Sequence, residues 1–182
     1  MTLALRLALL LSLALVFASG PTPASAQPSA EAVKAAFLPR FARYVVWPRA
    51  AVPAAAQPFQ LCVLGHDPFG AMLDRAAGGE LVDGHRVQVR RIGSAAQSAG
   101  CHLAYVHGAQ PQDTARHLLA LRSRPILTVT DAGAGPQRGI IHFTIIGGRV
   151  RFFIDDAAAA ERGLNISSRL LALAANVRQR RR

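Results

Sequence analysis

Short apolar segments alternate with helix-forming segments through the middle of this 182-residue chain. Three apolar segments are short and bounded by glycine, proline or polar residues, which is typical of buried strands: residues 59–65, 101–107 and 126–131. Residues 85–92 alternate valine with arginine and glutamine, which predicts a strand with one solvated face at a sheet edge. Helices are predicted between these strands. The alternation predicts an α/β fold of three layers, in which helices cover both faces of a mostly parallel sheet.

The pattern changes after residue 131. Residues 139–146 and 149–155 are apolar or alternating segments that flank Gly147-Gly148, a two-residue connection that suits an antiparallel hairpin. Helices are predicted over residues 155–163, capped by one of two aspartates, and over residues 167–178, capped by one of two serines. We therefore expect an antiparallel Gly-Gly hairpin beside the parallel part of the sheet.

The first 26 residues have the pattern of a cleaved export signal. A single early charge, Arg6, precedes a Leu/Ala-rich run, and the segment ends in the small-x-small pattern Ala24-Ser25-Ala26. The run is shorter than the roughly 20 residues that span a bilayer, and an uncleaved membrane anchor is the alternative. We expect a signal peptide over residues 1–26 and one exported domain over residues 27–182.

The net charge of +11 raises the question of nucleic acid binding. The basic residues are scattered and are not interleaved with aromatic residues as base-stacking sites require, and the export signal also argues against nucleic acid. Four arginines end the chain: Arg178, Arg180, Arg181 and Arg182. We expect residues 179–182 to be a solvated basic tail that attracts anionic lipid head groups, with no nucleic acid partner.

Two cysteines lie in the exported part, Cys62 in the first predicted strand and Cys101 in the third. In an oxidising compartment an even pair is more often a disulfide than two free thiols, and the chain-entropy model assigns such a bond roughly 4 kcal/mol. A metal site and a redox-active pair are the alternatives, although the Cys-x-x-Cys spacing of thiol oxidoreductases is missing. A disulfide requires Cα atoms within about 7 Å, which favours a 2-1-3 strand order.

Residues 29–47 carry apolar side chains at helical spacing and predict a first helix, which Pro39 should kink or split. Aromatic residues gather along it, with two arginines beside them. Packing in the core is one interpretation of these aromatics. The other is a surface that recognises a partner or ligand, because aromatic residues and arginine are enriched at interface hot spots. The candidate residues for this surface are Phe37, Arg40, Phe41, Tyr44, Trp47 and, in a later loop, Phe69.

Residues 60–73, QLCVLGHDPFGAML, combine an apolar strand, a glycine-containing turn and a helix start, as many phosphate-binding sites do. Asp67 before Pro68 is a strong N-cap pattern, and its carboxylate would occupy the free amides and repel a phosphate. The lysine of a P-loop and the central glycine of the dinucleotide fingerprint are missing. We therefore expect a self-capped turn in place of a nucleotide site.

Other candidate chemistry is sparse. The six histidines show no His-x-x-x-His or Glu-x-x-His spacing, so a zinc site would have to be assembled from distant residues. Ser94 and Ser98 lack the Gly-x-Ser-x-Gly elbow of hydrolases. We predict no catalytic residue, no metal site and no cofactor.

Six segments carry a resemblance to the YfiR family of exported bacterial proteins (YfiR/HmsC-like): VKAAFLPRFARYVVWP, PFQLCVLGHDPFGAML, CHLAYV, RPILTVTD, RGIIHFTIIGGRVRFFID and GLNISSRLLALA. None is a catalytic signature, and their joint order makes the match specific. The resemblance implies a periplasmic, non-enzymatic α/β domain, often a homodimer. It also implies a repressor that binds the periplasmic part of an inner-membrane diguanylate cyclase, lowers cyclic-di-GMP synthesis, and is sequestered by an outer-membrane lipoprotein.

Carried over residue by residue, the resemblance implies a disulfide between Cys62 and Cys101. Some members have a second cysteine pair where this chain has Gln137 and Thr144, so redox control through a second bridge is not expected here. Pro39 also departs from the family pattern. Members of the family bind small ligands in an apolar surface pocket, which keeps a second function open: a periplasmic small-molecule binding protein that serves another receptor or a transport system.

Overall fold

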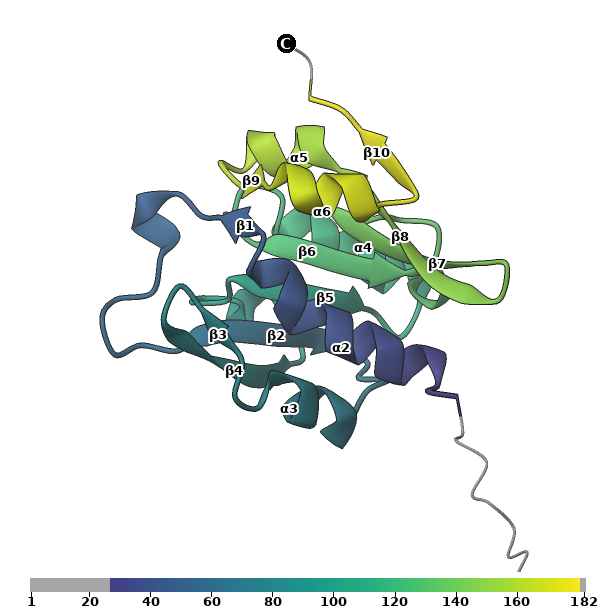
Figure 1. Cartoon of the computed structure of the whole chain (residues 1–182), viewed down its shortest axis with the longest axis horizontal. Helices are drawn as coiled ribbons and strands as arrows, with labels where there is room; N and C mark the ends of the chain where they lie inside the picture. The colour runs from purple at the N-terminus through teal and green to yellow at the C-terminus, as the bar shows by residue number, and fades with distance from the viewer. Residues whose placement is uncertain (1–26, 181–182) are drawn as a thin grey trace, which may run out of the picture.

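The structure, a computed structural model, describes residues 27–180 of the chain (Figure 1). The predicted signal peptide over residues 1–26 and the last two arginines lie outside the described residues. Within residues 27–180, eight strands form one mixed sheet and two short strands form a second. The chain therefore has the predicted mixed α/β class.

The large sheet is mostly parallel. Its strands are, in spatial order, β10 (Asn176–Arg178), β8 (Arg149–Asp155), β7 (Ile141–Ile146), β6 (Leu127–Asp131), β5 (Leu103–His107), β2 (Phe59–Gly65), β4 (His85–Ile92) and β3 (Leu81–Val82). Only β3–β4 and β7–β8 are antiparallel pairs in this sheet as described. β2 lies between β4 and β5, with Cys62 opposite Arg90 on one side and Ala104 on the other. The second sheet pairs β1 (Val45–Val46) with β9 (Asn165–Ile166).

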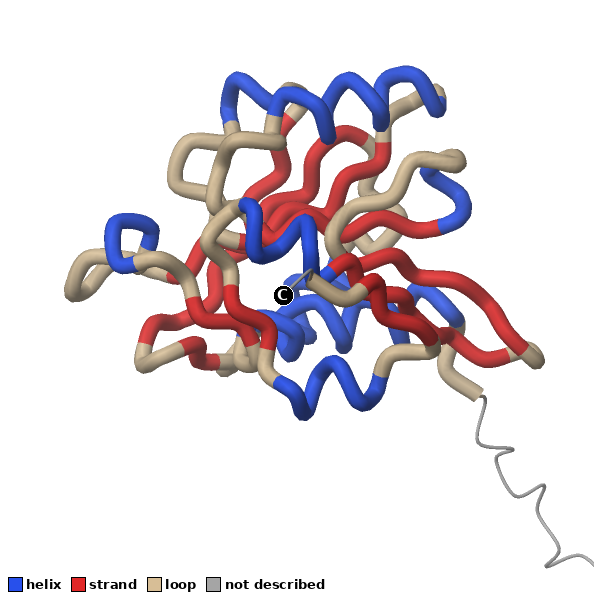
Figure 2. The backbone as a smooth tube through the Cα atoms, turned by 90° about the horizontal axis from the view of Figure 1, so that it is seen from above, coloured by secondary structure: helices blue, strands red, loops and turns tan. Residues whose placement is uncertain are grey.

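Helices lie on both faces of the large sheet, as Figures 1 and 2 show together. On one face, α2 (Ala30–Ala42), α3 (Ala71–Ala77) and α6 (Ser168–Leu173) contribute to the larger apolar core, and α5 (Asp156–Glu161) adds Ala159. On the other face, Leu121, directly after α4 (Pro111–Ala120), packs into a smaller core with Leu64 and Val106. Three 3₁₀ turns complete the described chain: η2 (Arg49–Ala51), η3 (Ala95–Gln97) and η4 (Ala132–Ala134).

The first helix is shorter than predicted. Ser29 caps it through a hydrogen bond from Ala32 N, and it continues through Pro39 as one helix that ends at Ala42, not at residue 47. Val45 and Val46, which are β-branched, leave the helix and pair with β9. Of the two outcomes expected for Pro39, a kink or a split, the split does not occur.

The last predicted helix, over residues 167–178, was also too long. Ser167 caps α6 as expected, but the helix ends at Leu173. Residues Asn176–Arg178 instead form β10, parallel to the end of β8. These residues form a strand because the open edge of β8 offers their backbone hydrogen bonds. Tertiary context therefore overrides their local helix propensity.

Strands β7 and β8 form a hairpin that projects from the body of the sheet (Figures 1 and 2). Gly147 and Gly148 connect them with φ angles of +57° and +71°, the left-handed pair that a type I′ turn requires. β6 pairs with β7 only as far as Phe143, and β10 pairs with β8 only from Phe153 onwards. The outer part of the hairpin therefore extends beyond both neighbouring strands.

Candidate functional site

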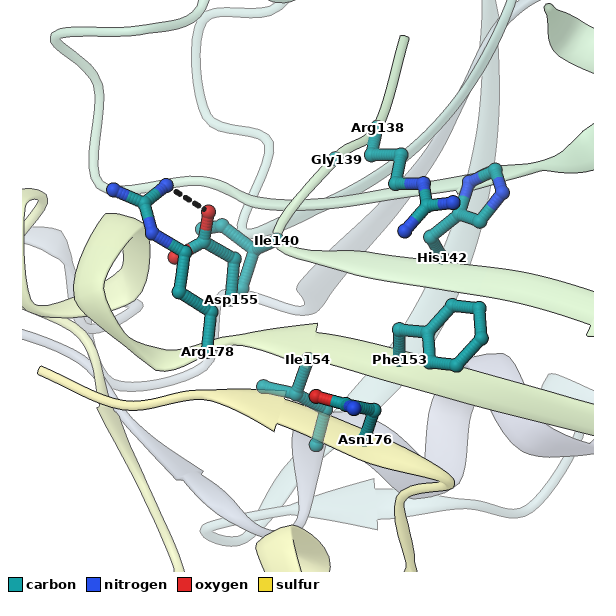
Figure 3. A pocket seen from close by; sticks show the side chains of 9 residues that line it. All are labelled: Arg138, Gly139, Ile140, His142, Phe153, Ile154, Asp155, Asn176 and Arg178. Atoms are coloured by element: carbon teal, nitrogen blue, oxygen red, sulfur yellow. Dashed lines mark hydrogen bonds and ion pairs between the residues drawn. The ribbon is translucent and has the colours of Figure 1, made fainter. Parts of the chain in front are cut away.

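A pocket of about 400 Å³ opens at the base of the hairpin, beside β7, β8 and β10 (Figure 3). Apolar side chains line part of it, notably Ile140, Phe153 and Ile154. Charged side chains in its lining are Arg138 and an ion pair between Arg178 and Asp155. Sites for small molecules or single side chains typically combine such an apolar floor with a few polar groups, in volumes of roughly 300–1,000 Å³.

Arg138 lies over an aromatic ring in this pocket. Its guanidinium carbon is 5.1 Å from the centre of the Phe153 ring, which is cation–π distance. The side chain is exposed, and no carboxylate of residues 27–180 forms an ion pair with it. Arg138 therefore holds its planar cation at the pocket without a neutralising partner from the described chain.

His142 is buried beside Arg138 (Figure 3). Thr130 Oγ1 accepts a hydrogen bond from Gly139 N at 2.9 Å and lies 2.9 Å from His142 Nδ1, with which it forms a second hydrogen bond. Burial lowers the pKa of His142, and the positive charge of Arg138 lowers it further.

Ion pairs anchor the C-terminal strand at the opposite side of the pocket. Arg178 Nη1 donates to Asp155 Oδ2 at 2.8 Å, the dashed line of Figure 3. Arg180 donates to both carboxylate oxygens of Asp156, at 2.7 and 2.8 Å. Arg180, the last described residue of the predicted basic tail, is exposed and is also paired with the start of α5.

A second polar cluster lies at the carboxyl ends of the central parallel strands. Asp131, the last residue of β6, accepts a hydrogen bond from Lys34 of α2 at 2.7 Å and from the Tyr105 hydroxyl at 2.9 Å. Burial raises the pKa of Asp131, but the bonds and charge of Lys34 and Tyr105 outweigh it, and the pKa lies below its usual value. His107 stands beside this cluster, with its pKa lowered by burial.

This cluster occupies the place where open α/β sheets commonly bind ligands, next to the reversal of strand order between β2 and β5. Its groups satisfy one another. The second oxygen of Asp131 accepts from Ala134 N at 3.1 Å and so caps η4. The arrangement therefore works as a buried tie between α2 and the sheet.

The turn after β2 keeps its own amides occupied. Asp67 Oδ1 accepts from Phe69 N at 2.8 Å and from Gly70 N at 3.2 Å. Arg91 binds the other Asp67 oxygen and also Asp74, in a network that spans β4 and α3. The helix starts at Ala71, three residues later than predicted, so Asp67 closes the turn before the helix instead of capping it.

The predicted recognition residues divide into buried and exposed sets. Phe41, Trp47 and Phe69 are core residues with at most 6% of their surface exposed, so they present no surface to a partner in this conformation. Phe37 is half-buried and packs against the same core. Arg40 and Tyr44 are exposed at the end of α2.

The structure joins Cys62 and Cys101 in a disulfide with Cα atoms 5.9 Å apart. Both cysteines are buried in the smaller core. The Arg90 guanidinium lies against the bond, 3.2 Å from Cys101 Sγ, and donates to the carbonyls of Gln97 and Ala99. The cross-link therefore fastens the loop before β5 to the centre of the sheet.

Neither the residues of the pocket nor the buried cluster that links α2 to the sheet was predicted from the sequence. Two signals were present. The first is that no aspartate or glutamate occurs between Asp131 and Asp155, while this interval contains three arginines. The second is that Lys34 is the only lysine among 21 lysines and arginines, an isolated choice inside an apolar helix. The contacts of Arg138 with Phe153 and of Lys34 with Asp131 join segments that only the tertiary fold brings together, so they could not be predicted from local sequence.

Residues 27–180 contain no group of three or more histidine, cysteine or acidic side chains placed to hold a metal ion. None of the helices in this part of the chain is both long and apolar enough to cross a membrane.

Comparison with known proteins identifies the family. A family model described as YfiR/HmsC-like matches residues 31–175, which is nearly the whole described domain. A comparison with curated proteins finds no match. The matched region includes the disulfide and most of the pocket lining. Since the match covers well over half of the chain, the chain belongs to the YfiR/HmsC-like family.

Proposed function

We propose that this protein is a periplasmic regulator that binds the periplasmic part of an inner-membrane diguanylate cyclase and restrains cyclic-di-GMP synthesis. The match of residues 31–175 to the YfiR/HmsC-like family carries this proposal, because the family is periplasmic, regulatory and non-catalytic. The proposal includes removal of residues 1–26 as a signal peptide. The disulfide between Cys62 and Cys101 supports an oxidising compartment.

Two features of the domain support a binding function. The most polar buried groups, Lys34, Asp131 and Tyr105, are bonded to one another and hold the fold together. Exposed groups of the kind that bind proteins lie elsewhere. At the end of α2, Arg40 and Tyr44 are accessible, and we include them with the neighbouring edge of Phe37 as candidate partner contacts.

Co-purification tests the proposal. The tagged mature chain, residues 27–182, is mixed with the purified periplasmic domain of the diguanylate cyclase encoded next to it in its own genome. We expect a stable complex by size-exclusion chromatography. Elution of the two proteins as separate species, at concentrations well above those in the periplasm, would contradict the proposal.

The proposal extends to two further partners. An outer-membrane lipoprotein would relieve the restraint by competing with the cyclase for the mature chain, and two copies of the chain would form a homodimer. Light scattering of the mature chain alone checks the dimer, for which we expect twice the mass of one chain.

The pocket at the hairpin base favours a second candidate function, a periplasmic small-molecule binding protein for another receptor or transport system. Its apolar floor and cationic rim suit a small anion with an apolar body. Thermal shift against aromatic amino acids and nucleotides separates the two functions. A ligand that raises the melting temperature, with no complex formed with any cyclase domain, would favour the second.

A further inference from the structure

The strand register gives the β7–β8 hairpin one strongly basic face. In an antiparallel pair, directly opposite residues point to the same side, and side chains alternate sides along each strand. His142 is opposite Phe153 at the base, Thr144 is opposite Arg151, and Ile146 is opposite Arg149 at the tip. Arg138, stacked on Phe153, extends this face at the base.

The arginines on this face form no ion pair in the described chain, and the one carboxylate of β8, Asp155, is paired with Arg178. Arg138, Arg149 and Arg151 are all exposed, and no ion pair of residues 27–180 includes any of them. Some other arginines of the described domain, such as Arg91 and Arg178, do have carboxylate partners. The three hairpin arginines therefore create a local positive field that attracts acidic groups.

None of the helices in residues 27–180 covers this face. The opposite side of the hairpin packs onto α2, where the rings of Phe41 and Phe152 are 5.0 Å apart. On the basic side, the apolar core under α4 draws its strand residues from β2, β4 and β5, and includes none from β7 or β8. The face consequently remains open from the tip of the hairpin down to the pocket.

The chemistry of the face defines its partner. Guanidinium groups bind carboxylates in a planar, bidentate geometry, so a row of arginines suits glutamate and aspartate side chains. The pocket over Phe153, with its apolar floor, has room for one large apolar side chain of the same segment. Ile146, which is 48% exposed, adds an apolar contact at the tip.

We propose that this basic hairpin face, formed by Arg138, Arg149, Arg151 and the pocket over Phe153, binds an acidic protein segment that inserts one apolar side chain into the pocket. The inference rests on the proposed function in that the segment is assigned to the periplasmic part of the cyclase. A protein segment is favoured over an anionic membrane because a recessed pocket selects a single side chain, whereas a bilayer presents a flat surface.

Charge reversal on the hairpin tests this inference. The variant Arg149→Glu/Arg151→Glu changes two exposed side chains, and the matched control Arg75→Glu/Arg86→Glu makes the same charge change on α3 and β4, toward the other end of the sheet. Two protein ligands are titrated, the cyclase periplasmic domain and a synthetic peptide with glutamates on both sides of one phenylalanine, and anionic lipid vesicles are titrated in parallel. Melting temperatures of both variants verify folding.

We expect the hairpin variant to bind both ligands at least about tenfold more weakly, and the control to stay within about twofold of the wild type. If the hairpin variant and the control lose affinity equally, the effect comes from net charge alone and the inference is overturned. Unchanged binding by the hairpin variant, or wild-type binding only to anionic lipid vesicles, would also overturn it. The wild type could bind the peptide through the hairpin and fail to bind the cyclase domain. In that case the proposed function fails, and the site for an acidic segment stands.

Discussion

Lys34, the only lysine of the chain, lies with its Nζ atom 2.7 Å from Asp131 Oδ2, and this buried ion pair ties the first helix to the end of a central strand. Both side chains are largely shielded from water, and the Tyr105 hydroxyl binds the same carboxylate oxygen. Loss of one partner would leave an uncompensated charge in the interior, which is far more costly than loss of a surface pair.

Replacement of Lys34 should therefore destabilise the domain strongly. We expect Lys34→Met to lower the free energy of unfolding by about 3 kcal/mol, measured by urea denaturation. The control is Arg43→Met, which removes the exposed pair with Glu80 and should cost less than about 1 kcal/mol. Equal effects of the two substitutions would contradict the role assigned to Lys34.

Removal of the disulfide should cost a comparable amount. The bond closes a loop with a sequence separation of 39 residues. For Cys62→Ala/Cys101→Ala we expect a loss of roughly 4 kcal/mol in unfolding free energy relative to the oxidised wild type, since the unfolded chain regains its loop entropy. The wild type in a strong reductant serves as the comparison. A loss below about 1 kcal/mol in both samples would show that the bond adds little to this fold.

Stability should fall as the pH is lowered through the histidine range. Burial lowers the pKa of His102, and its Nδ1 accepts a hydrogen bond from Gln60 N at 2.9 Å, which requires an unprotonated nitrogen. The unfolded state therefore binds the second ring proton of His102 more readily than the folded state does. The contribution of His102 to the free energy of unfolding is fully present above the unfolded pKa of about 6.5. This contribution is lost as the pH falls toward the folded pKa, by up to about 1.4 kcal/mol per pH unit.

Urea denaturation at several pH values between about 7.5 and about 5, a range that brackets the ordinary histidine pKa, checks this prediction. His102→Gln should be less stable at neutral pH and should show a shallower dependence on pH than the wild type. An identical slope in the variant would assign the pH dependence to other groups, such as buried His142, whose pKa is also lowered by burial.

Two neighbouring aromatic residues of the predicted recognition surface should behave differently. Phe41 is almost fully buried, with ring centres of Phe37 and Phe143 both 5.5 Å away, so Phe41→Ala should cost about 3–5 kcal/mol. Tyr44 is 37% exposed, and Tyr44→Ala should change stability by less than about 1 kcal/mol. Thermal and chemical denaturation measure both. A large destabilisation by Tyr44→Ala would place that side chain in the core after all.

The central parallel strands β2, β5 and β6 could be predicted from sequence because each is a short apolar run that stops at a glycine, a proline or a polar residue. The same reasoning failed at the two ends of the domain. Residues 176–178 follow a helical apolar pattern, yet they pair with β8, and residues 45–46 pair with β9. Both errors arise because an open strand edge elsewhere in the fold offers hydrogen bonds that no local pattern reveals.

The candidate site was harder to predict than the fold. Aromatic residues suggested a surface on the first helix, but composition cannot separate a core ring such as Trp47 from an exposed one. Arg138 lies before the start of β7 and meets Phe153 only because β7 pairs with β8. The interval without acidic residues was visible in the sequence, and it gains meaning once the hairpin is seen to project with its arginines on one face.

The level of cyclic-di-GMP in living cells tests the regulatory function most directly. Deletion of the gene should raise cyclic-di-GMP, and the complete gene should restore the original level, whereas a version that lacks residues 1–26 should not, because it stays on the wrong side of the inner membrane. The same cells without the neighbouring cyclase should show no response to the deletion. An unchanged cyclic-di-GMP level after deletion, with the cyclase present and expressed, would contradict the regulatory function.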